Sequence, residues 1–406
     1  MDIDKHPMIA SLGDGCCGCG ACAASCPKGC VSLISDSLGF RYSEIDFSRC
    51  VACGSCDRVC PAFSNSSVQP AKEVLWACSL DEEERLASSS GGLFGLLAME
   101  TLSSGGTVYG AAFSSDLKEV SHIRVDSMAS LDSVMRSKYV QSVVARDVYS
   151  GVAKDLREDR NVLFCGTACQ VSGLSLYLAR KRVSQEKLLL LDVICHGVPS
   201  PRLWSDWVSA SEVKSGAKAT NINFRNKESG WTAYSVRYAY EAGVDGSPKV
   251  CSNRFPDDWY MKAFLRNASI RESCLKCPAK RSCGSDLTLG DYWGVKNVHP
   301  EAFDDKGTSA IIVNTDKGRA ALSAIASELN MGASTYAGVL AGNPSIEKSV
   351  SPYPERHKFL ADVASGMSID ELEAKWTFQP TRAQVLQKKI RDFGGKVKRR
   401  IQGMID

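Results

Sequence analysis

The chain has 406 residues, of which 44% are hydrophobic and 23% are charged, and its formal net charge is +3. This length suffices for two or three domains with a sizeable core, and the composition is typical of a soluble globular protein. The near-neutral charge argues against nucleic acid as a partner. The first residues lack the basic and apolar stretches of a signal peptide, and no apolar run approaches the ~20 residues of a membrane span.

A cysteine pattern of twelve residues occurs twice near the start of the chain. Cys16-x-x-Cys19-x-x-Cys22-x-x-x-Cys26-Pro27 returns as Cys50-x-x-Cys53-x-x-Cys56-x-x-x-Cys60-Pro61. This run is typical of bacterial ferredoxins, in which three cysteines bind one 4Fe–4S cluster and the fourth binds the other cluster. Structural zinc sites are the alternative, but zinc requires neither the third C-x2 step nor the Cys-Pro ending. The repeat therefore predicts two 4Fe–4S clusters.

The ferredoxin pattern also predicts how the ligands are shared. We assign Cys16, Cys19, Cys22 and Cys60 to the first cysteine site, and Cys50, Cys53, Cys56 and Cys26 to the second cysteine site. Between the runs, Val31–Ile34 and Phe40–Tyr42 flank a segment that ends in Gly39, which predicts a hairpin with Gly39 in the turn. Cys17 and Cys30 lie outside the ligand pattern, and we assign them as free thiols.

The cysteine content indicates a reducing compartment. Eighteen cysteines would suggest disulfides in a short secreted chain. Eight of them lie in the two ferredoxin runs, which need reduced thiols. We therefore expect a cytoplasmic protein, and its cluster load suggests an anaerobic or low-oxygen cell.

Downstream of the repeat, a polar segment ending in Pro70 reads as a linker, and alternating strand and helix patterns follow it. The patterns predict strands at Val74–Cys78, Thr107–Phe113, Asn161–Cys165, Lys187–Cys195, Tyr234–Tyr240 and Ile311–Asn314, and helices at Leu93–Leu102 and Val171–Arg182. The second helix lies between two strands, and such a β-α-β order favours an α/β core with partly parallel strands.

The last segment, Thr381–Asp406, is rich in lysine and arginine, and apolar residues recur along it at helical spacing. Such a helix could bind an anionic membrane surface or an acidic partner. We favour a terminal helix that packs on its own domain, because Gly394 and Gly395 interrupt the pattern.

A second, sparser group of cysteines follows the repeat. Cys274-Leu-Lys-Cys277-Pro278 has the spacing of a metal half-site, which needs two further ligands from elsewhere in the fold. Cys169 and Cys195 are candidates because both are predicted at strand ends, where α/β folds place their sites. Cys283 is the rival for either position, and buried apolar thiols are the alternative interpretation.

Ser88–Gly92 is a candidate anion site, because small residues at a helix start expose backbone N–H groups to a ligand such as a pyrophosphate. Serine-rich helix caps without a ligand are also common. Gly166-Thr167 has the same position between a strand and a helix and carries the same ambiguity.

Seven short motifs occur in order between Val74 and about Val295. They are Ser89-Ser90-Gly91-Gly92, Ser137-Lys138-Tyr139-Val140-Gln141-Ser142, Gly166-Thr167-Ala168-Cys169-Gln170, Cys195-His196-Gly197-Val198-Pro199-Ser200, Phe224-Arg225-Asn226-Lys227 with Gly230-Trp231, Cys274-x-x-Cys277, and Asp286–Gly294. Together they resemble the coenzyme F-420 hydrogenase/dehydrogenase beta-subunit family, some members of which carry an N-terminal two-cluster ferredoxin module. Ala168 departs from the family, which usually has proline there.

The resemblance implies a bound FAD and a third 4Fe–4S cluster in the flavin domain. Carried over motif by motif, it places the cluster on Cys169, Cys195, Cys274 and Cys277, which we call the third cysteine site. It places the flavin on Ser90, Gly91, Gly92, Lys138, Tyr139, Gln141 and Thr167. Lys138 could offset phosphate charge and Tyr139 could pack on a ring, whereas an ordinary surface lysine and core aromatic are the alternatives.

We therefore expect an α+β/α-β chain, with a bacterial-type ferredoxin module at residues 1–62, a linker at 63–72, an α/β FAD-binding domain with a mixed sheet at 73–375 and a helical C-terminal tail at 376–406. The expected function is that of an iron–sulfur flavoprotein oxidoreductase. Ferredoxin, another redox protein or reduced deazaflavin would be the partner, and a small molecule or coenzyme F-420 the substrate. A non-catalytic electron-transfer subunit of a larger complex is the alternative. No catalytic acid is assigned, although His196 and Asp291 lie in the motifs.

Overall fold

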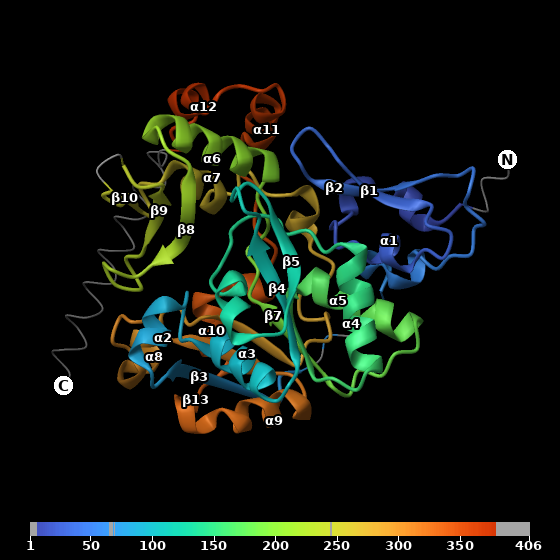
Figure 1. Ribbon diagram of the computed structural model, residues 1–406, viewed down its shortest axis with the longest axis horizontal. Helices are drawn as coiled ribbons and strands as arrows, with labels where there is room; N and C mark the ends of the chain where they lie inside the picture. The colour runs from blue at the N-terminus through green and yellow to red at the C-terminus, as the bar shows by residue number, and fades with distance from the viewer. Residues whose placement is uncertain (1–5, 65–67, 69, 244–245, 379–406) are drawn as a thin grey trace.

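Figure 1 shows the computed structural model, which describes residues 6–64, 68, 70–243 and 246–378. A cysteine-rich N-terminal module, drawn in blue, lies at one side of a larger α/β body (Figure 1). The module contains helix α1 (Ala21–Ser25), strands β1 (Val31–Ser35) and β2 (Arg41–Ile45), and single 3-10 turns at Met8–Ser11, Gly13–Gly15, Asp57–Val59 and Pro61–Phe63.

Strands β1 and β2 form the hairpin that the sequence predicts. They pair antiparallel from Val31 opposite Ile45 to Ser35 opposite Arg41. The Asp36 carboxylate accepts hydrogen bonds from the backbone N–H groups of Leu38 and Phe40 and so closes the turn. Gly39 has φ of +78°, a conformation that favours glycine.

The larger body is built on an eight-stranded mixed sheet. Its strands, in spatial order, are β13 (Leu329–Ala333), β3 (Glu73–Ser79), β12 (Ser309–Val313), β11 (Leu287–Asp291), β7 (Leu188–Val193), β6 (Val162–Thr167), β4 (Thr107–Phe113) and β5 (Val120–Val125). The four central strands β11, β7, β6 and β4 run parallel to one another. The pairs β4–β5, β11–β12, β12–β3 and β3–β13 are antiparallel. The predicted β-α-β unit is confirmed as β6, α5 (Ala168–Arg180) and β7.

Helices cover both faces of this sheet. Helices α3 (Leu93–Ser103) and α9 (Asp316–Ala324) pack on one face, and α4 (Arg146–Arg157) and α5 pack on the other. Side chains alternate along a strand, so Val108 of β4 joins the α3 and α9 core while neighbouring Tyr109 joins the α4 and α5 core. Helix α1 of the N-terminal module contacts both α4 and α5, and this contact places the ferredoxin runs against the sheet's second helical layer.

A smaller three-stranded antiparallel sheet stands beside the large one (Figure 1). It consists of β8 (Ala219–Asn226), β9 (Ser235–Tyr240) and β10 (Lys249–Arg254), and it packs with α6 (Pro201–Ser215), α7 (Trp259–Leu265), α11 (Arg356–Ala364) and α12 (Ile369–Lys375). Aromatic side chains dominate its core, among them stacked Trp207 and Trp259. The short helices α2 (Glu82–Ala87), α8 (Val295–Val298) and α10 (Tyr336–Gly342) complete the body.

Each strand and helix predicted in the body has a counterpart within a few residues of its expected bounds. The prediction of a basic helix at Thr381–Asp406 falls outside the described residues. Within the described part of the chain, every helix is too short or too polar to cross a bilayer.

Candidate functional site

The first cysteine site is buried where the N-terminal module meets the body. Cys16, Cys19, Cys22 and Cys60 are each at most 9% exposed. Helix α1 begins after Gly20, whose φ is +85°, and a Cβ there would lie 2.4 Å from the Val144 carbonyl oxygen. Glycine therefore lets the cysteine loop approach the body closely. Burial raises the pKa of Cys60 to about 11, which favours its neutral thiol form in the absence of a nearby positive charge.

The second cysteine site lies at the surface of the module. Cys53 is exposed and Cys50 is half-buried, whereas Cys26 and Cys56 are buried. Cys30 joins this group, because its Sγ lies 3.4 Å from the Sγ of Cys26. The sequence assigned Cys30 as a free thiol, since its spacing does not fit the run.

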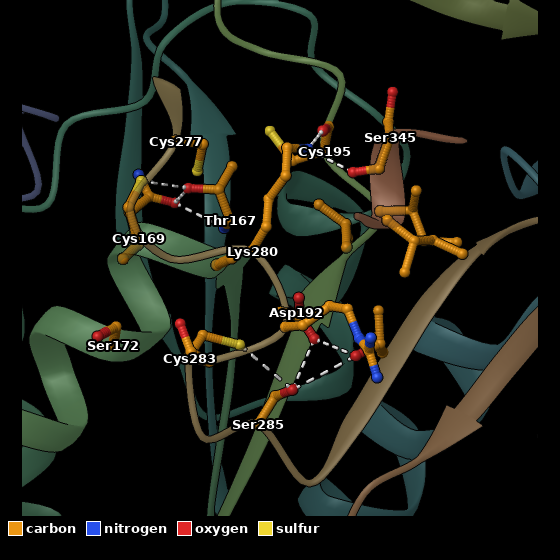
Figure 2. Close-up of a pocket in the computed structure, with 18 of the residues that line it drawn as sticks. Thr167, Cys169, Ser172, Asp192, Cys195, Cys277, Lys280, Cys283, Ser285 and Ser345 are labelled. Carbon is orange, nitrogen blue, oxygen red and sulfur yellow. Dashed lines mark hydrogen bonds between the residues drawn. The ribbon is translucent and has the colours of Figure 1, made fainter. Parts of the chain in front are cut away.

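The four cysteines of the third cysteine site line one pocket of about 320 Å³. Figure 2 shows Cys169, Cys195 and Cys277 in this pocket. Cys169 lies in the first turn of α5, Cys195 follows β7, and Cys274 and Cys277 lie in and just after a 3-10 turn at Glu272–Lys276. Burial first, and then the charges of Cys274, Cys169 and Cys277, raise the pKa of Cys195. The fold thus brings the four thiols to one pocket, but among the described residues no group of three or more Cys, His, Asp or Glu side chains lies close enough to hold a single metal ion.

Cys283 lines the same pocket but belongs to a different group of side chains. Its thiol lies 3.5 Å from Ser285 Oγ, and that hydroxyl donates a 2.6 Å hydrogen bond to buried Asp192 (Figure 2). Burial raises the pKa of the Asp192 carboxyl. These contacts hold Cys283 on the Asp192 side of the pocket.

Cys17 lies between the first and third cysteine sites. Its side chain lines the pocket that holds Cys169 and packs against the core that contains Cys19. Its interaction with the Cys169 thiol raises the pKa of that group. Its carbonyl oxygen accepts a 3.1 Å hydrogen bond from Gln141 Nε2. Sequence reasoning treated Cys17 as unrelated to either site, because residues 17 and 169 are brought together only by the fold.

Arg271 joins the same two sites and is fully buried. Its guanidinium donates to the carbonyl oxygens of Cys16 (2.8 Å) and Arg41 (2.9 Å) and to Gln141 Oε1 (3.1 Å). It also lies 4.2 Å from the centre of the Tyr42 ring. Within the described part of the chain, none of its contacts is a carboxylate. In the sequence, the one feature that could have pointed to Arg271 is its position three residues before the C-x2-C pair.

The charge of Arg271 reaches the third cysteine site as well. The backbone N–H of Cys274 donates to the Arg271 carbonyl oxygen at 3.1 Å. Burial raises the pKa of Cys274, and the Arg271 charge opposes that rise. A buried cation without an acid partner is costly unless an anionic group lies nearby, and two clusters with cysteine thiolates would supply such charge.

Helix α5 contacts all three cysteine sites. Cys169 lies in its first turn, and a Cβ on Gly173 would lie 3.1 Å from the Sγ of Cys19. At its far end, Arg180 donates a 3.2 Å hydrogen bond to Ser55 Oγ, in the loop of the second cysteine site. The three sites are therefore attached to one rigid element.

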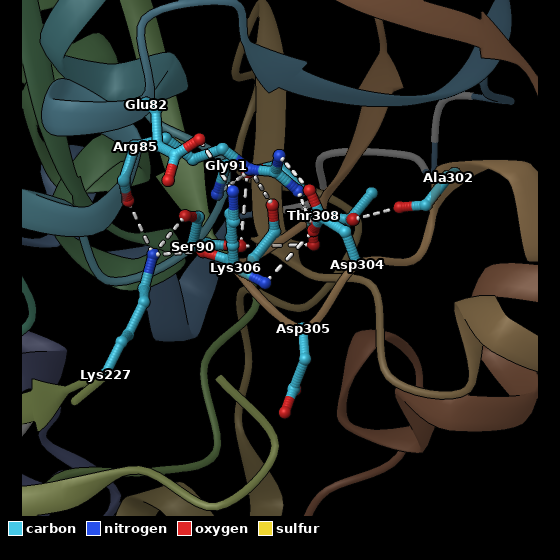
Figure 3. A network of polar contacts seen from close by, with 12 residues as sticks. Glu82, Arg85, Ser90, Gly91, Lys227, Ala302, Asp304, Asp305, Lys306 and Thr308 are labelled. Atoms are coloured by element: carbon cyan, nitrogen blue, oxygen red, sulfur yellow. Dashed lines mark hydrogen bonds and ion pairs between the residues drawn. The ribbon is translucent and has the colours of Figure 1, made fainter. Parts of the chain in front are cut away.

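The seven candidate flavin residues are not brought to one place. Ser90, Gly91 and Gly92 precede α3 and are tied to the loop before β12 (Figure 3). Gly91 N–H donates to Ser309 Oγ at 2.9 Å, and a Cβ on Gly91 would lie 2.5 Å from the Ala77 carbonyl oxygen. The close packing against β3 and β12 thus explains why a glycine occupies position 91, and no bound phosphate is needed to explain it.

Lys227 holds this loop from the side of the small sheet (Figure 3). Its buried ammonium donates to the carbonyl oxygens of Arg85 (2.6 Å), Ser90 (2.6 Å) and Lys306 (2.9 Å). Burial lowers the pKa of Lys227 to about 7, but three carbonyl acceptors use all three N–H bonds of the charged form.

Lys227→Met is expected to lower the free energy of unfolding by several kcal/mol, since each buried carbonyl left unpaired costs about 1–3 kcal/mol. Denaturant unfolding at neutral pH measures the change. Lys306→Met is the matched control, because its ion pair with Glu82 is solvent-accessible and such pairs contribute about 0–1 kcal/mol. Equal losses in the two variants would contradict the role given to Lys227.

Lys138 and Tyr139 lie in a second group. The Lys138 ammonium donates to the carbonyl oxygen of Met135 at 2.6 Å, and burial lowers its pKa to about 7. Tyr139 stacks on Phe264 with ring centres 5.1 Å apart, and its hydroxyl accepts a 3.2 Å hydrogen bond from Arg225. Tyr139 is thus part of the aromatic core as well as a candidate for ring packing.

Arg225 and Asp291 form an ion pair beside Tyr139. The shortest contact is 2.7 Å, and Trp231 Nε1 also donates to Asp291 at 2.7 Å. Arg225 Nε is buried and has no hydrogen-bond partner in the described part of the chain. This N–H is a donor for an acceptor group that the described residues do not supply, whereas the ammonium groups of Lys138 and Lys227 are already bonded to carbonyl oxygens.

The remaining two flavin candidates line the cysteine pocket. Thr167 caps α5, and its Oγ1 lies 3.3 Å from Cys169 Sγ (Figure 2). Gln141 is held between Arg271 and Cys17. His196 also lines the pocket, and its Nε2 lies 2.6 Å from Asn267 Oδ1. Burial lowers the pKa of His196, which disfavours its protonated form.

Comparison with known families identifies two segments of the chain. Residues 159–336 match the family described as the C terminus of the beta subunit of coenzyme F420 hydrogenase/dehydrogenase. Residues 15–63 match a 4Fe-4S dicluster domain. The first segment contains all four residues of the third cysteine site, and the second contains all eight ferredoxin cysteines.

Curated relatives match only short parts of the chain. The B subunit of the Na⁺-translocating ferredoxin:NAD⁺ oxidoreductase complex of Acetobacterium woodii is 32% identical over 91 residues, which are 21% of this chain and 26% of that protein. The DNA-directed RNA polymerase subunit Rpo3 of Methanosarcina acetivorans is 40% identical over 47 residues, 12% of this chain and 17% of that subunit. The matches thus span about a quarter or less of the relatives' length.

Among solved structures, a chain of the F420-reducing [NiFe] hydrogenase complex from Methanosarcina barkeri is 14% identical, with 76% of this chain and 92% of that chain covered at a TM-score of 0.44. The sequence matches carry the assignment. The protein is an iron–sulfur protein with an N-terminal 4Fe–4S dicluster domain, and its residues 159–336 are similar to the C terminus of the coenzyme F420 hydrogenase/dehydrogenase beta subunit.

Proposed function

We propose that the protein is an iron–sulfur flavoprotein oxidoreductase that moves electrons between a redox partner at its surface and a substrate in its α/β body. The observation that carries the proposal is the order of the cysteine sites. The second site is at the surface, the first is buried, and Cys17 lines the pocket of the third site while packing against the core that contains Cys19 of the first.

The bound groups would supply the redox chemistry. Clusters of the 4Fe–4S type carry single electrons, and FAD, when bound, converts between single-electron and hydride chemistry. The eight ferredoxin cysteines would hold two clusters, and Cys169, Cys195, Cys274 and Cys277 a third. Burial of the first site keeps water from its thiolates, and Arg271 places a fixed positive charge between the first and third sites.

The flavin is proposed for the region between the loop before α3 and the small sheet. There Ser90–Gly92 and Lys138 would face its phosphates and Tyr139 its ring, with Thr167 and Gln141 at the cysteine pocket. The buried Nε of Arg225, which has no hydrogen-bond partner among the described residues, supports an acceptor group of a ligand there. We further propose domain limits of 1–62, 63–72, 73–375 and 376–406.

The direction of electron flow is proposed to run from a reduced ferredoxin or similar donor toward a small organic substrate. The chain's own ferredoxin module favours this over the reverse, in which reduced deazaflavin such as coenzyme F-420 gives hydride to the flavin. A non-catalytic subunit of a larger complex is the second candidate, and the relatives that are themselves subunits of redox complexes favour it.

Anaerobic purification with iron, sulfide and flavin analysis tests the cofactor content. We expect about twelve irons and one FAD per chain, which corresponds to three 4Fe–4S clusters. About eight irons without flavin would contradict the flavin domain and the third cluster together. Turnover of candidate substrates with an artificial reductant then separates the two functions, because a reductase works alone and a subunit needs its partner.

A further inference from the structure

The surface around the second cysteine site has the features of a docking site for an electron carrier. Cys53 is exposed, and its neighbours Val51 and Ala52 project into solvent, with Val51 58% exposed. The first and third cysteine sites, in contrast, have no fully exposed thiol. An electron from outside therefore reaches the second site over the shortest path through protein.

Three cations surround this exposed loop. Lys28 is exposed and lines a small cavity together with Val51 and Cys53. Exposed Arg49 donates a 2.8 Å hydrogen bond to the Lys28 carbonyl oxygen, and exposed Arg58 donates a 2.6 Å hydrogen bond to the Cys53 carbonyl oxygen. The backbone thus fixes both guanidinium groups at the rim of the second site.

These cations are available to a partner. Within residues 6–64, 68, 70–243 and 246–378, none of the three forms an ion pair. Exposed Asp46 lies near Arg49, since the hydrogen bond from Ser48 and then the charge of Arg49 lower the pKa of Asp46, but it bonds to Ser48 rather than to the guanidinium. Exposed positive charge around a redox site attracts a negatively charged partner and orients its approach.

We propose that an acidic electron-carrier protein docks on this face, with Lys28, Arg49 and Arg58 against its carboxylates and Val51 at the centre of the contact. The inference rests on the proposed function, which requires an external electron partner. In the step that follows docking, the carrier is oxidised by one electron and the second site is reduced by one electron, with no bond or proton transferred. A small apolar centre with a charged rim suits a transient contact.

The double variant Lys28→Glu/Arg49→Glu of the full chain, purified anaerobically, tests this surface. The probe is a reduced bacterial ferredoxin of negative net charge, and stopped-flow absorbance measures the rate of cluster reduction. At low salt we expect the second-order rate constant to fall about tenfold or more. Added salt should slow the wild type and have little effect on the double variant.

The matched control is Lys218→Glu, since Lys218 is exposed on the small-sheet side of the body. It is expected to react with ferredoxin as the wild type does. Reduction of the double variant by methyl viologen at the wild-type rate, with unchanged iron content, shows that its clusters are intact.

Equal ferredoxin rates for the wild type and the double variant would overturn the docking surface while leaving the proposed function in place. If reduced methyl viologen failed to reduce the clusters of the wild-type protein, that result would instead contradict the proposed function. Charge-dependent binding of the wild type to anionic vesicles, with no effect of the variant on ferredoxin, would overturn the proposal in favour of a membrane surface.

Discussion

Replacing Arg271 by methionine is expected to lower the reduction potentials of the first and third cysteine sites and to leave that of the second unchanged. The guanidinium lies beside the Cys16 carbonyl and its charge acts on Cys274. Removing a buried positive charge makes an added electron less stable. A tenfold change in the one-electron equilibrium corresponds to ~59 mV, and we expect a shift of at least that size. Redox titration followed by electron paramagnetic resonance measures each site.

The conservative variant Arg271→Lys separates charge from hydrogen bonding. It keeps the positive charge but cannot reproduce three donations in a planar fork. We therefore expect its potentials to stay closer to those of the wild type, while its free energy of unfolding falls as in Arg271→Met because buried acceptors lose donors at about 1–3 kcal/mol each. Equal potential shifts at all three sites, or none, would contradict a local electrostatic effect.

Replacing Cys277 by alanine is expected to remove one cluster and leave the other two. Cys277 lies on the pocket wall with Cys169, Cys195 and Cys274, and a 4Fe–4S cluster is normally held by four cysteines. The iron content should fall from about twelve to about eight per chain. The spectroscopic signals of the two ferredoxin clusters should remain.

The matched control is Cys283→Ala, in the same pocket. The Cys283 thiol is hydrogen-bonded to Ser285 on the side of the pocket where Asp192 lies, so this variant is expected to keep all its iron. The reverse result, with iron lost from Cys283→Ala and kept by Cys277→Ala, would make Cys283 the fourth ligand. Loss of all clusters in a folded Cys277→Ala protein would contradict the proposed partition of ligands.

The sequence predicted those parts of the fold that local pattern determines. The hairpin of β1 and β2 has a glycine turn between short apolar runs, and β6, α5 and β7 have clear periodicity with a capped helix between them. In contrast, β10 (Lys249–Arg254) is polar and largely exposed, so nothing in its composition marks it as a strand. It forms because it pairs with β9.

The candidate site shows the same division. The ferredoxin cysteines and the C-x2-C pair are visible from spacing, since their ligands lie close together in the chain. The position of Cys17 beside Cys169 depends on how the module packs on α5, which no local pattern reports. Gly91 was interpreted as a phosphate contact, but its close approach to Ala77 and Ser309 gives it a packing role that sequence cannot distinguish from binding.

The contacts of α5 imply that electron-transfer distances in this protein do not depend on how two mobile parts happen to meet. The helix rises about 1.5 Å per residue, and Cys169, Gly173 and Arg180 mark the three sites along it. One added residue in its middle would advance the far end by that rise and rotate it by about 100°, which would pull Arg180 away from Ser55. The contacts of the N-terminal module therefore depend on the length of this helix. A ferredoxin module taken from another protein would not place its cysteine sites at the same distances from the third cysteine site.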